Sequence, residues 1–107
     1  MLQFKPMKLY INTKDKDTIH VALKSGGKVM DSLTDHNKYG SQVLLPLIEK
    51  ILKKNKLQFK DLKEIEVETG PGSFTGLRVG VAVANALGFG LKIPVNGKKT
   101  ELVLEYS

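Results

Sequence analysis

The 107-residue sequence contains no cysteine and no tryptophan. Without cysteine it can form no disulfide scaffold, no thiolate zinc site and no cysteine nucleophile. Long hydrophobic runs are also missing. The longest apolar stretch, residues 79–91, is too short and too rich in glycine and alanine for a membrane span, and the N-terminus has no signal-peptide pattern. We therefore expect a cytoplasmic protein without membrane association.

The sequence has few acidic residues: it contains 17 lysines and arginines but only 11 aspartates and glutamates, so its net charge is +6. A basic balance favours a nucleic-acid partner. The only dense basic stretch contains Lys53, Lys54, Lys56 and Lys60. Such a stretch is more often the solvated end of a helix, where lysines complement the partial negative charge of the last carbonyls. The sequence leaves both interpretations open.

The periodicity of apolar residues predicts the order of elements. Ile19, Val21 and Leu23 alternate with polar residues as in a strand, and the following Ser-Gly-Gly-Lys is typical of a hairpin turn. Apolar residues between positions 44 and 52 recur at three- and four-residue steps, which indicates one face of a helix. The expected strands are residues 7–12, 18–24, 29–34, 63–69 and 93–95, and the expected helices are residues 41–55, 75–89 and 99–107.

This β-β-β-α-β-α-β-α order predicts an α/β fold, in which a meander of three strands continues into a mixed five-stranded sheet with helices on its faces. These are the elements of one ribonuclease H-like lobe. With 41% hydrophobic and 26% charged residues, the chain is expected to form a single globular domain over residues 1–107.

One segment stands out as a glycine-rich turn between a strand and a helix. It consists of Gly70, Pro71, Gly72, Ser73, Phe74, Thr75, Gly76, Leu77 and Arg78. Glycines permit tight backbone geometry there, and Ser73 or Thr75 can cap the helix. The spacing fits neither a P-loop nor a dinucleotide fingerprint. A structural turn is favoured over a phosphate-binding site, although backbone N–H groups at a helix start can hold an anion.

The helix that follows is almost free of charge, since Arg78 is the only charged residue between Phe74 and Leu91. Its small residues recur every four positions, at Gly76, Gly80, Ala84 and Gly88. Glycine costs up to about 1 kcal/mol relative to alanine within a helix, so this pattern indicates a close neighbour. That neighbour is either the first helix of the same chain or another protein, and the pattern alone does not decide.

The segment from Gly70 to Gly80 closely resembles the signature of the TsaB (YeaZ) family, which belongs to the bacterial machinery that installs threonylcarbamoyladenosine on tRNA. Flanking segments agree: Leu9-Tyr10-Ile11-Asn12-Thr13, Leu44-Leu45-Pro46-Leu47-Ile48, and Ile93-Pro94-Val95 followed by Gly97. The resemblance extends from about Met7 to Thr100.

The resemblance implies an actin- and hexokinase-like (ASKHA) lobe that acts as a noncatalytic partner of TsaD, the transferase subunit, with TsaE joining in a larger complex and tRNA contacted indirectly. It also implies that the first two helices pair with those of TsaD or of a second copy. The interface residues expected on this basis are Leu44, Leu47, Ile48, Ile51, Gly76, Gly80, Val83, Ala84 and Leu87. A bulky charged residue at Gly80 or Ala84 is then expected to abolish pairing with TsaD while the domain stays folded.

Three departures from the family pattern bear on nucleotide binding. Asn12-Thr13-Lys14 replaces the usual Asp-Thr-Ser, and an amide is a much weaker magnesium ligand than a carboxylate. Gly40-Ser41-Gln42 replaces the usual His-Ser-Glu, and the sequence stops at Ser107, before the family's second lobe. Because the ATP cleft of this fold lies between two lobes, we expect no cofactor, no metal and poor ATP binding.

Three rival functions remain in view beside a scaffold role. Metal-dependent hydrolysis needs converging acids, and Asp15, Asp17, Asp31 and Asp35 do not show that pattern, while His20 and His36 are isolated. No serine, histidine and carboxylate constellation is evident either, so no catalytic residue is expected. The second rival is a weak tRNA-binding module, and a homodimeric structural or regulatory module is a third possibility.

Overall fold

The computed structural model describes residues 6–15, 17–36 and 40–99, and within them strands and helices form as most of the periodicity predicts. The strands are β1 (Met7–Asn12), β2 (Thr18–Ser25), β3 (Lys28–His36) and β4 (Leu62–Val67), and the helices are α1 (Gly40–Lys54), the short 3-10 helix η1 (Phe59–Asp61) and α2 (Phe74–Leu91). Predicted and observed ends differ by one or two residues, which is the usual uncertainty of an element boundary.

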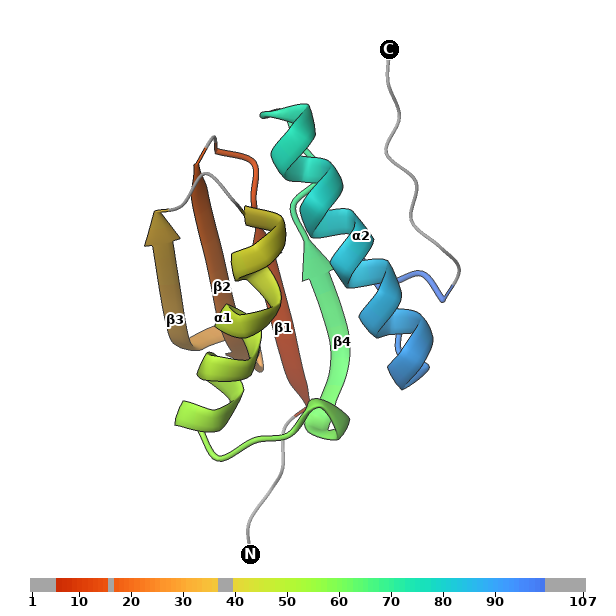
Figure 1. Cartoon of the computed structure of the whole chain (residues 1–107). Helices are drawn as coiled ribbons and strands as arrows, with labels where there is room; N and C mark the ends of the chain where they lie inside the picture. The colour runs from red at the N-terminus through yellow and green to blue at the C-terminus, as the bar shows by residue number, and fades with distance from the viewer. Residues whose placement is uncertain (1–5, 16, 37–39, 100–107) are drawn as a thin grey trace, which may run out of the picture.

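The sheet is mixed, with strand order β3-β2-β1-β4 (Figure 1). β1, β2 and β3 form the predicted antiparallel meander, and β4 returns parallel to β1 after α1. Gly26 and Gly27 make the β2–β3 turn with φ of 58° and 80°, a backbone region that glycine enters without steric cost. The register sets Leu9 beside Leu23 on one side and Ile65 on the other, so one row of apolar side chains crosses the sheet.

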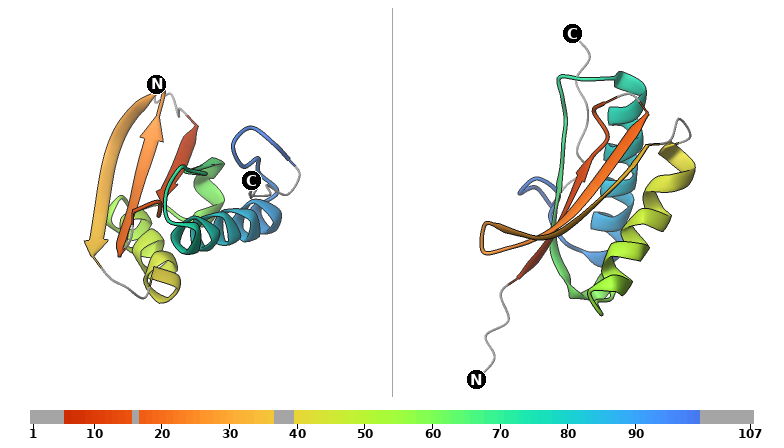
Figure 2. Two further views of the ribbon diagram at one scale, coloured as in Figure 1. Left: turned by 90° about the horizontal axis from the view of Figure 1, so that it is seen from above. Right: turned by 90° about the vertical axis from the view of Figure 1, so that its left-hand side faces the viewer.

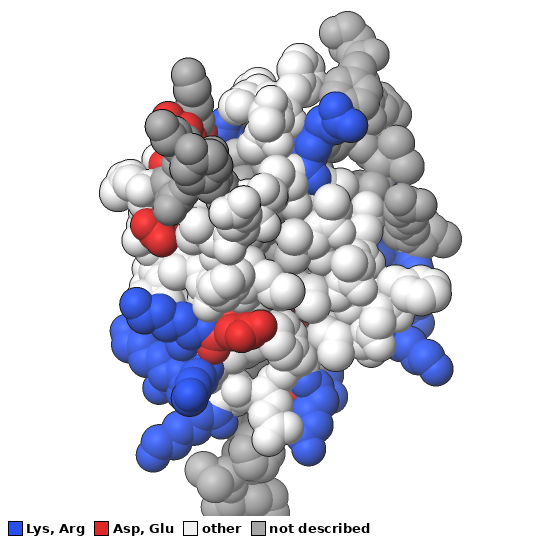
Figure 3. Space-filling view, viewed as in Figure 1, with Lys and Arg blue, Asp and Glu red and all other residues white. Residues whose placement is uncertain are grey.

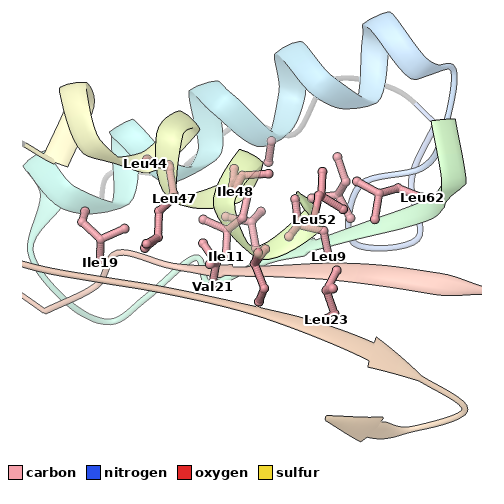
Figure 4. Close-up of a cluster of buried hydrophobic side chains, with 14 of the residues drawn as sticks. Leu9, Ile11, Ile19, Val21, Leu23, Leu44, Leu47, Ile48, Leu52 and Leu62 are labelled. Atoms are coloured by element: carbon pink, nitrogen blue, oxygen red, sulfur yellow. The ribbon is translucent and has the colours of Figure 1, made fainter. Parts of the chain in front are cut away.

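α1 and α2 both cover the same face of the sheet, so the described residues form two layers (Figure 2). The core lies between these layers, where alternate residues of β1, β2 and β4 meet the apolar side of α1 (Figure 4). Leu9, Ile11 and Ile65 are fully buried there. Five residues expected at a partner interface belong to this core: Leu44, Leu47, Ile48, Ile51 and Ala84.

The opposite face of the sheet is polar and carries no described helix (Figure 2). Lys24 Nζ lies 2.8 Å from Glu66 Oε1 and 4.3 Å from the centre of the Tyr10 ring, and Lys8 Nζ lies 3.5 Å from Glu66 Oε2. Burial and the Glu68 carboxylate raise the pKa of Tyr10, so its hydroxyl stays protonated and donates to Glu68 at 3.3 Å. These cross-strand pairs give partners to the charged side chains that alternate with the core residues on β1, β2 and β4.

The expected fifth strand does not form as a strand, and the described sheet has four strands instead of five. Residues 93–95 contribute only one parallel bridge, between Val95 and Ile65. Asn96 then turns into the left-handed region with φ of 50°, and its side-chain amide takes over the next hydrogen bonds. It accepts from the Val67 N–H at 2.8 Å and donates to the Val67 carbonyl at 3.0 Å. The expected helix at residues 99–107 lies outside the described residues, apart from Lys99, which is not helical.

Candidate functional site on the helical layer

The glycine-rich turn joins β4 to α2 and rests on the loop after β1. The Ser73 N–H donates to the Lys14 carbonyl at 2.8 Å, and the Ser73 hydroxyl accepts from the Gly76 N–H at 3.4 Å as the helix cap. A Cβ at Gly72 would lie 2.6 Å from the Lys14 carbonyl oxygen, so only glycine fits. Of the two cap candidates, Ser73 is confirmed as the N-cap of α2. The glycine at position 72 is explained by the close approach of the turn to Lys14.

Thr13 is the buried polar residue on which the start of α2 sits. It is 1% exposed, and its hydroxyl donates to the Gly76 carbonyl. An added Cβ at Gly76 would meet the Thr13 carbonyl oxygen, and one at Gly80 would meet the Thr13 hydroxyl. The helix axis therefore lies close to β1 because these two positions have no side chain.

The small-residue stripe faces this chain's own sheet, which corrects both interpretations drawn from the sequence. A Cβ added at Gly80 would meet Thr13, Ile11 and Val67, one added at Gly88 would meet Val95, and Ala84 is fully buried. The neighbour is thus the sheet rather than α1 or another protein. A charged residue at Gly80 or Ala84 would disrupt the core and leave no folded domain with which to test pairing.

Burial within this chain also covers most of the residues that were expected at the partner interface. Of the nine residues expected there, Leu44, Leu47, Ile48, Ile51, Gly80 and Ala84 are buried within this chain, while Gly76, Val83 and Leu87 are half-buried. The apolar side of each helix that periodicity detects is the side that the sheet covers, so most of the residues expected at the interface are covered by this chain itself.

An apolar surface nevertheless remains on the outside of the helices. On α2 the exposed apolar positions Phe74, Ala82, Ala86 and Phe89 lie along one side of the helix, with the exposed Arg78 among them, and α1 adds Leu45. We call the five apolar residues the outer helical face. Phe89 is 90% exposed, Phe74 57% and Leu45 41%. Figure 3 shows uncharged atoms over most of this side of the molecule.

A groove at the C-terminal end of α2 continues this surface. It measures about 450 Å³, and its lining combines apolar residues, Ala82, Ala86, Phe89, Ile93 and Val95 among them, with the polar residues Asn85, Lys98 and Lys99. Large contiguous apolar patches on a protein surface mark sites of contact with protein or lipid. By length and composition α2 could also cross a membrane. In the structure, however, its other side is packed on β1 and β4 through Leu77, Gly80 and Val81, as in a helix of a folded domain.

Of the acidic and histidine residues considered for catalysis, Asp31, His20 and His36 have local side-chain partners. Asp31 accepts from the Asn55 amide at 2.9 Å and pairs with Lys54 at 3.2 Å, and the Asn55 hydrogen bond is the main cause that lowers the pKa of Asp31. His20 shares a hydrogen bond with Thr34 at 2.8 Å, across the β2–β3 pair. Among the described residues, no three acidic or histidine side chains converge as a metal site would require.

Asn12, which stands where the family usually has aspartate, has a local structural contact. Its side-chain oxygen accepts from the Lys14 N–H at 3.0 Å and closes a turn after β1. This turn places the Lys14 carbonyl where Ser73 binds it. The sequence did not predict the hydrogen bond from Thr13 to Gly76 at the start of α2. The only sequence signal for it was a threonine between an apolar strand and a polar loop.

A family model, curated protein sequences and solved structures all match this chain to proteins of threonylcarbamoyladenosine biosynthesis. The family model described as tRNA N6-adenosine threonylcarbamoyltransferase (TsaD) matches residues 30–100. The TsaB proteins of Buchnera aphidicola subsp. Schizaphis graminum and Escherichia coli are 38% and 31% identical over 78 and 84 residues, which cover 72% and 78% of this chain. The structure of YeaZ from Pseudomonas aeruginosa superimposes with a TM-score of 0.76 at 28% identity and covers 84% of this chain.

The chain spans less than half the length of these relatives: 37% and 36% of the two TsaB proteins, and 42% of the YeaZ chain. The matched family model covers more than half of the chain, and the relatives that agree in sequence and in fold carry the TsaB or YeaZ name. The chain therefore belongs to the family of the threonylcarbamoyltransferase model and, within it, to its TsaB (YeaZ) proteins.

Proposed function

We propose that this chain is a noncatalytic partner subunit in the biosynthesis of threonylcarbamoyladenosine on tRNA, and that it acts in the cytoplasm by pairing with TsaD. The names of the TsaB relatives support the pathway. The outer helical face supports the mode of action, because it is a surface suited to protein contact. TsaE would join the assembled pair, and tRNA would be bound mainly by the other subunits.

The single observation that carries this proposal is the exposed apolar row along α2. Phe89 and Phe74 are more than half exposed, and Arg78 is the only charged residue on the helix. Interfaces are enriched in aromatic residues and depleted of charge at their centres. Burying apolar area contributes about 25 cal/mol per Å², so two phenylalanines and the alanines between them provide an anchor.

The resemblance to the TsaD model also supports the choice of partner. Because this chain matches the family model of the transferase, the two proteins are expected to share a lobe with matching helices. Related surfaces can pair around an approximate two-fold axis, as identical surfaces do in isologous dimers. The same geometry makes a homodimer the alternative state of the chain when TsaD is absent.

The experiment measures the affinity of the purified chain for TsaD from the same cell by titration calorimetry. Ala86→Glu and Phe89→Glu each place a carboxylate on the outer helical face without touching the core. We expect each to weaken binding about 30-fold or more, which corresponds to about 2 kcal/mol at an interface centre.

Val29→Glu is the matched control, since Val29 is 59% exposed and lies at the other end of the molecule on the edge strand β3. It should bind like the parent chain, and all three variants should retain the parent melting temperature. Unchanged affinity of Ala86→Glu and Phe89→Glu for TsaD would show that the interface lies elsewhere.

A further inference from the structure

The C-terminal end of α1 carries a group of lysines that the proposed pairing does not use. Lys50, Lys53 and Lys54 lie in its last turns, and Lys56 follows directly after the helix. At 100° per residue, the three helical lysines fall within one outward arc of about 100°. Figure 3 shows lysine and arginine side chains gathered over this end of the molecule. We call these four residues the α1-end lysines.

Charge in the sequence is concentrated at this place. Residues 49–63 contain six lysines against Glu49 and Asp61, so they hold a net +4 of the chain's +6. Asp61 already accepts the Gln58 N–H at 2.8 Å as a local cap. No 15-residue stretch elsewhere in the chain contains as many lysines.

Most of this charge has no acidic partner. Among the described residues the ion pairs involve only Lys8, Lys24 and Lys54 as donors. Lys54 pairs with Asp31, which fixes the end of α1 against β3. Lys50, Lys53 and Lys56 are exposed and unpaired in this part of the chain. Complementing the helix C-terminus explains Lys53 and Lys54, which lie in the last turn, but it does not explain Lys50 and Lys56.

The position of these lysines relates them to the proposed interface. Leu45 of the outer helical face lies five residues before Lys50 on α1, which is about 7.5 Å along the helix axis and about 140° around it. Lys54, on the same outward arc as Lys50, pairs with Asp31 of β3. A protein that covers the outer helical face therefore leaves the lysines outside the contact, in solvent. An extended polyanion held by the partner can reach them there.

We propose that the α1-end lysines bind the phosphodiester backbone of the tRNA that the assembled complex modifies. The inference rests on the proposed function, which supplies the RNA. Lysine ammonium groups bind phosphates as point charges without reading bases, and double-helical RNA is recognised largely through its backbone and shape. Each neutralised phosphate releases counterions, so this contact has a distinct salt dependence.

The test measures binding of unmodified tRNA by the purified complex with TsaD between 50 and 300 mM KCl. The triple variant Lys50→Gln, Lys53→Gln, Lys56→Gln should reduce the slope of log affinity against log salt by about two and weaken binding about tenfold or more at the lowest salt. The control is Lys14→Gln, Lys28→Gln, Lys92→Gln, which removes the same charge outside both the α1 end and the groove and should change both quantities much less. Light scattering must show that each variant complex has the parent mass.

The outcomes separate this inference from the function on which it rests. If the parent chain does not assemble with TsaD, the proposed function fails, and the tRNA contact fails with it. If both triple variants assemble and share the same slope and affinity, the tRNA contact alone is refuted. If the Lys50, Lys53, Lys56 variant no longer assembles while the control does, these lysines bind TsaD and not RNA.

Discussion

Gly76 is the residue at which the structure places the tightest demand on the sequence. A Cβ there would meet the Thr13 carbonyl, a backbone atom that cannot move away as a flexible side chain would. We expect Gly76→Ala to lower the free energy of unfolding by about 3 kcal/mol, as overpacking of a close contact does. Urea denaturation of the full chain measures the change.

Gly90 provides the matched control on the same helix. No atom outside its own helical surroundings would contact an added Cβ, and its backbone is helical, so Gly90→Ala should raise the free energy of unfolding by up to about 1 kcal/mol. If the two substitutions change stability by the same amount, α2 is not seated on Thr13 as described.

Glu66 links the stability of the polar sheet face to pH. The hydrogen bond from Lys24, together with the charge of Lys8, lowers the pKa of Glu66 below its ordinary value of about 4.5. A carboxyl whose pKa is lower in the folded state stabilises the fold above its unfolded-state pKa and loses that contribution as pH falls through the folded-state value.

Glu66→Gln should therefore lower the free energy of unfolding at pH 7, and the difference from the parent chain should shrink as pH falls below about 4.5. Denaturation of both proteins from pH 7 to pH 3 gives this comparison. A difference that stays constant over the whole range would mean that the Lys24 and Lys8 contacts contribute nothing in solution.

Single residues also show where sequence reasoning reaches its limit. The cap at Ser73 was predictable, because the hydroxyl and the N–H groups that it satisfies are neighbours in the chain. The contact between Thr13 and Gly76 was not, because it joins positions 63 residues apart and depends on how α2 crosses β1. A four-residue repeat of glycine indicates a close approach, but it does not say which surface approaches.

At the scale of elements, periodicity located four strands and both long helices. It failed at residues 93–95, where Val95 forms a single bridge to the sheet, at Ile65, and Asn96 binds Val67 of β4 through its side chain. The Asn96 amide accepts from the backbone N–H and donates to the backbone carbonyl as a neighbouring strand would, and apolar alternation does not predict such a contact. Periodicity also identified the buried sides of α1 and α2, whereas the apolar residues on their outer sides were found from the exposure in the structure.

The side chain of Asn96 is thus expected to hold the free edge of β4. Asn96→Ala removes both hydrogen bonds to Val67 and should lower the free energy of unfolding by about 1–2 kcal/mol. Amide hydrogen exchange should show faster exchange at Val67 in this variant. Unchanged protection of the Val67 amide would contradict the edge-capping role.

At the scale of the whole molecule, the sheet offers one polar face of paired charges and one face covered by helices, whose own outer side is apolar. The α1-end lysines are exposed in the last turns of α1 and just after it. In our proposals, the apolar outer side binds a protein partner and these lysines bind a polyanion. The fold and the family were accessible from the sequence, whereas the side of each helix that faces outward required the structure.

The measurement that tests the central claim most directly is size-exclusion chromatography with light scattering, run on the chain alone and on an equimolar mixture with TsaD from the same cell. The account predicts a mixed peak with the mass of one copy of each protein, and its loss with Phe89→Glu. Separate elution of the two parent proteins, each at its own mass, would contradict the account.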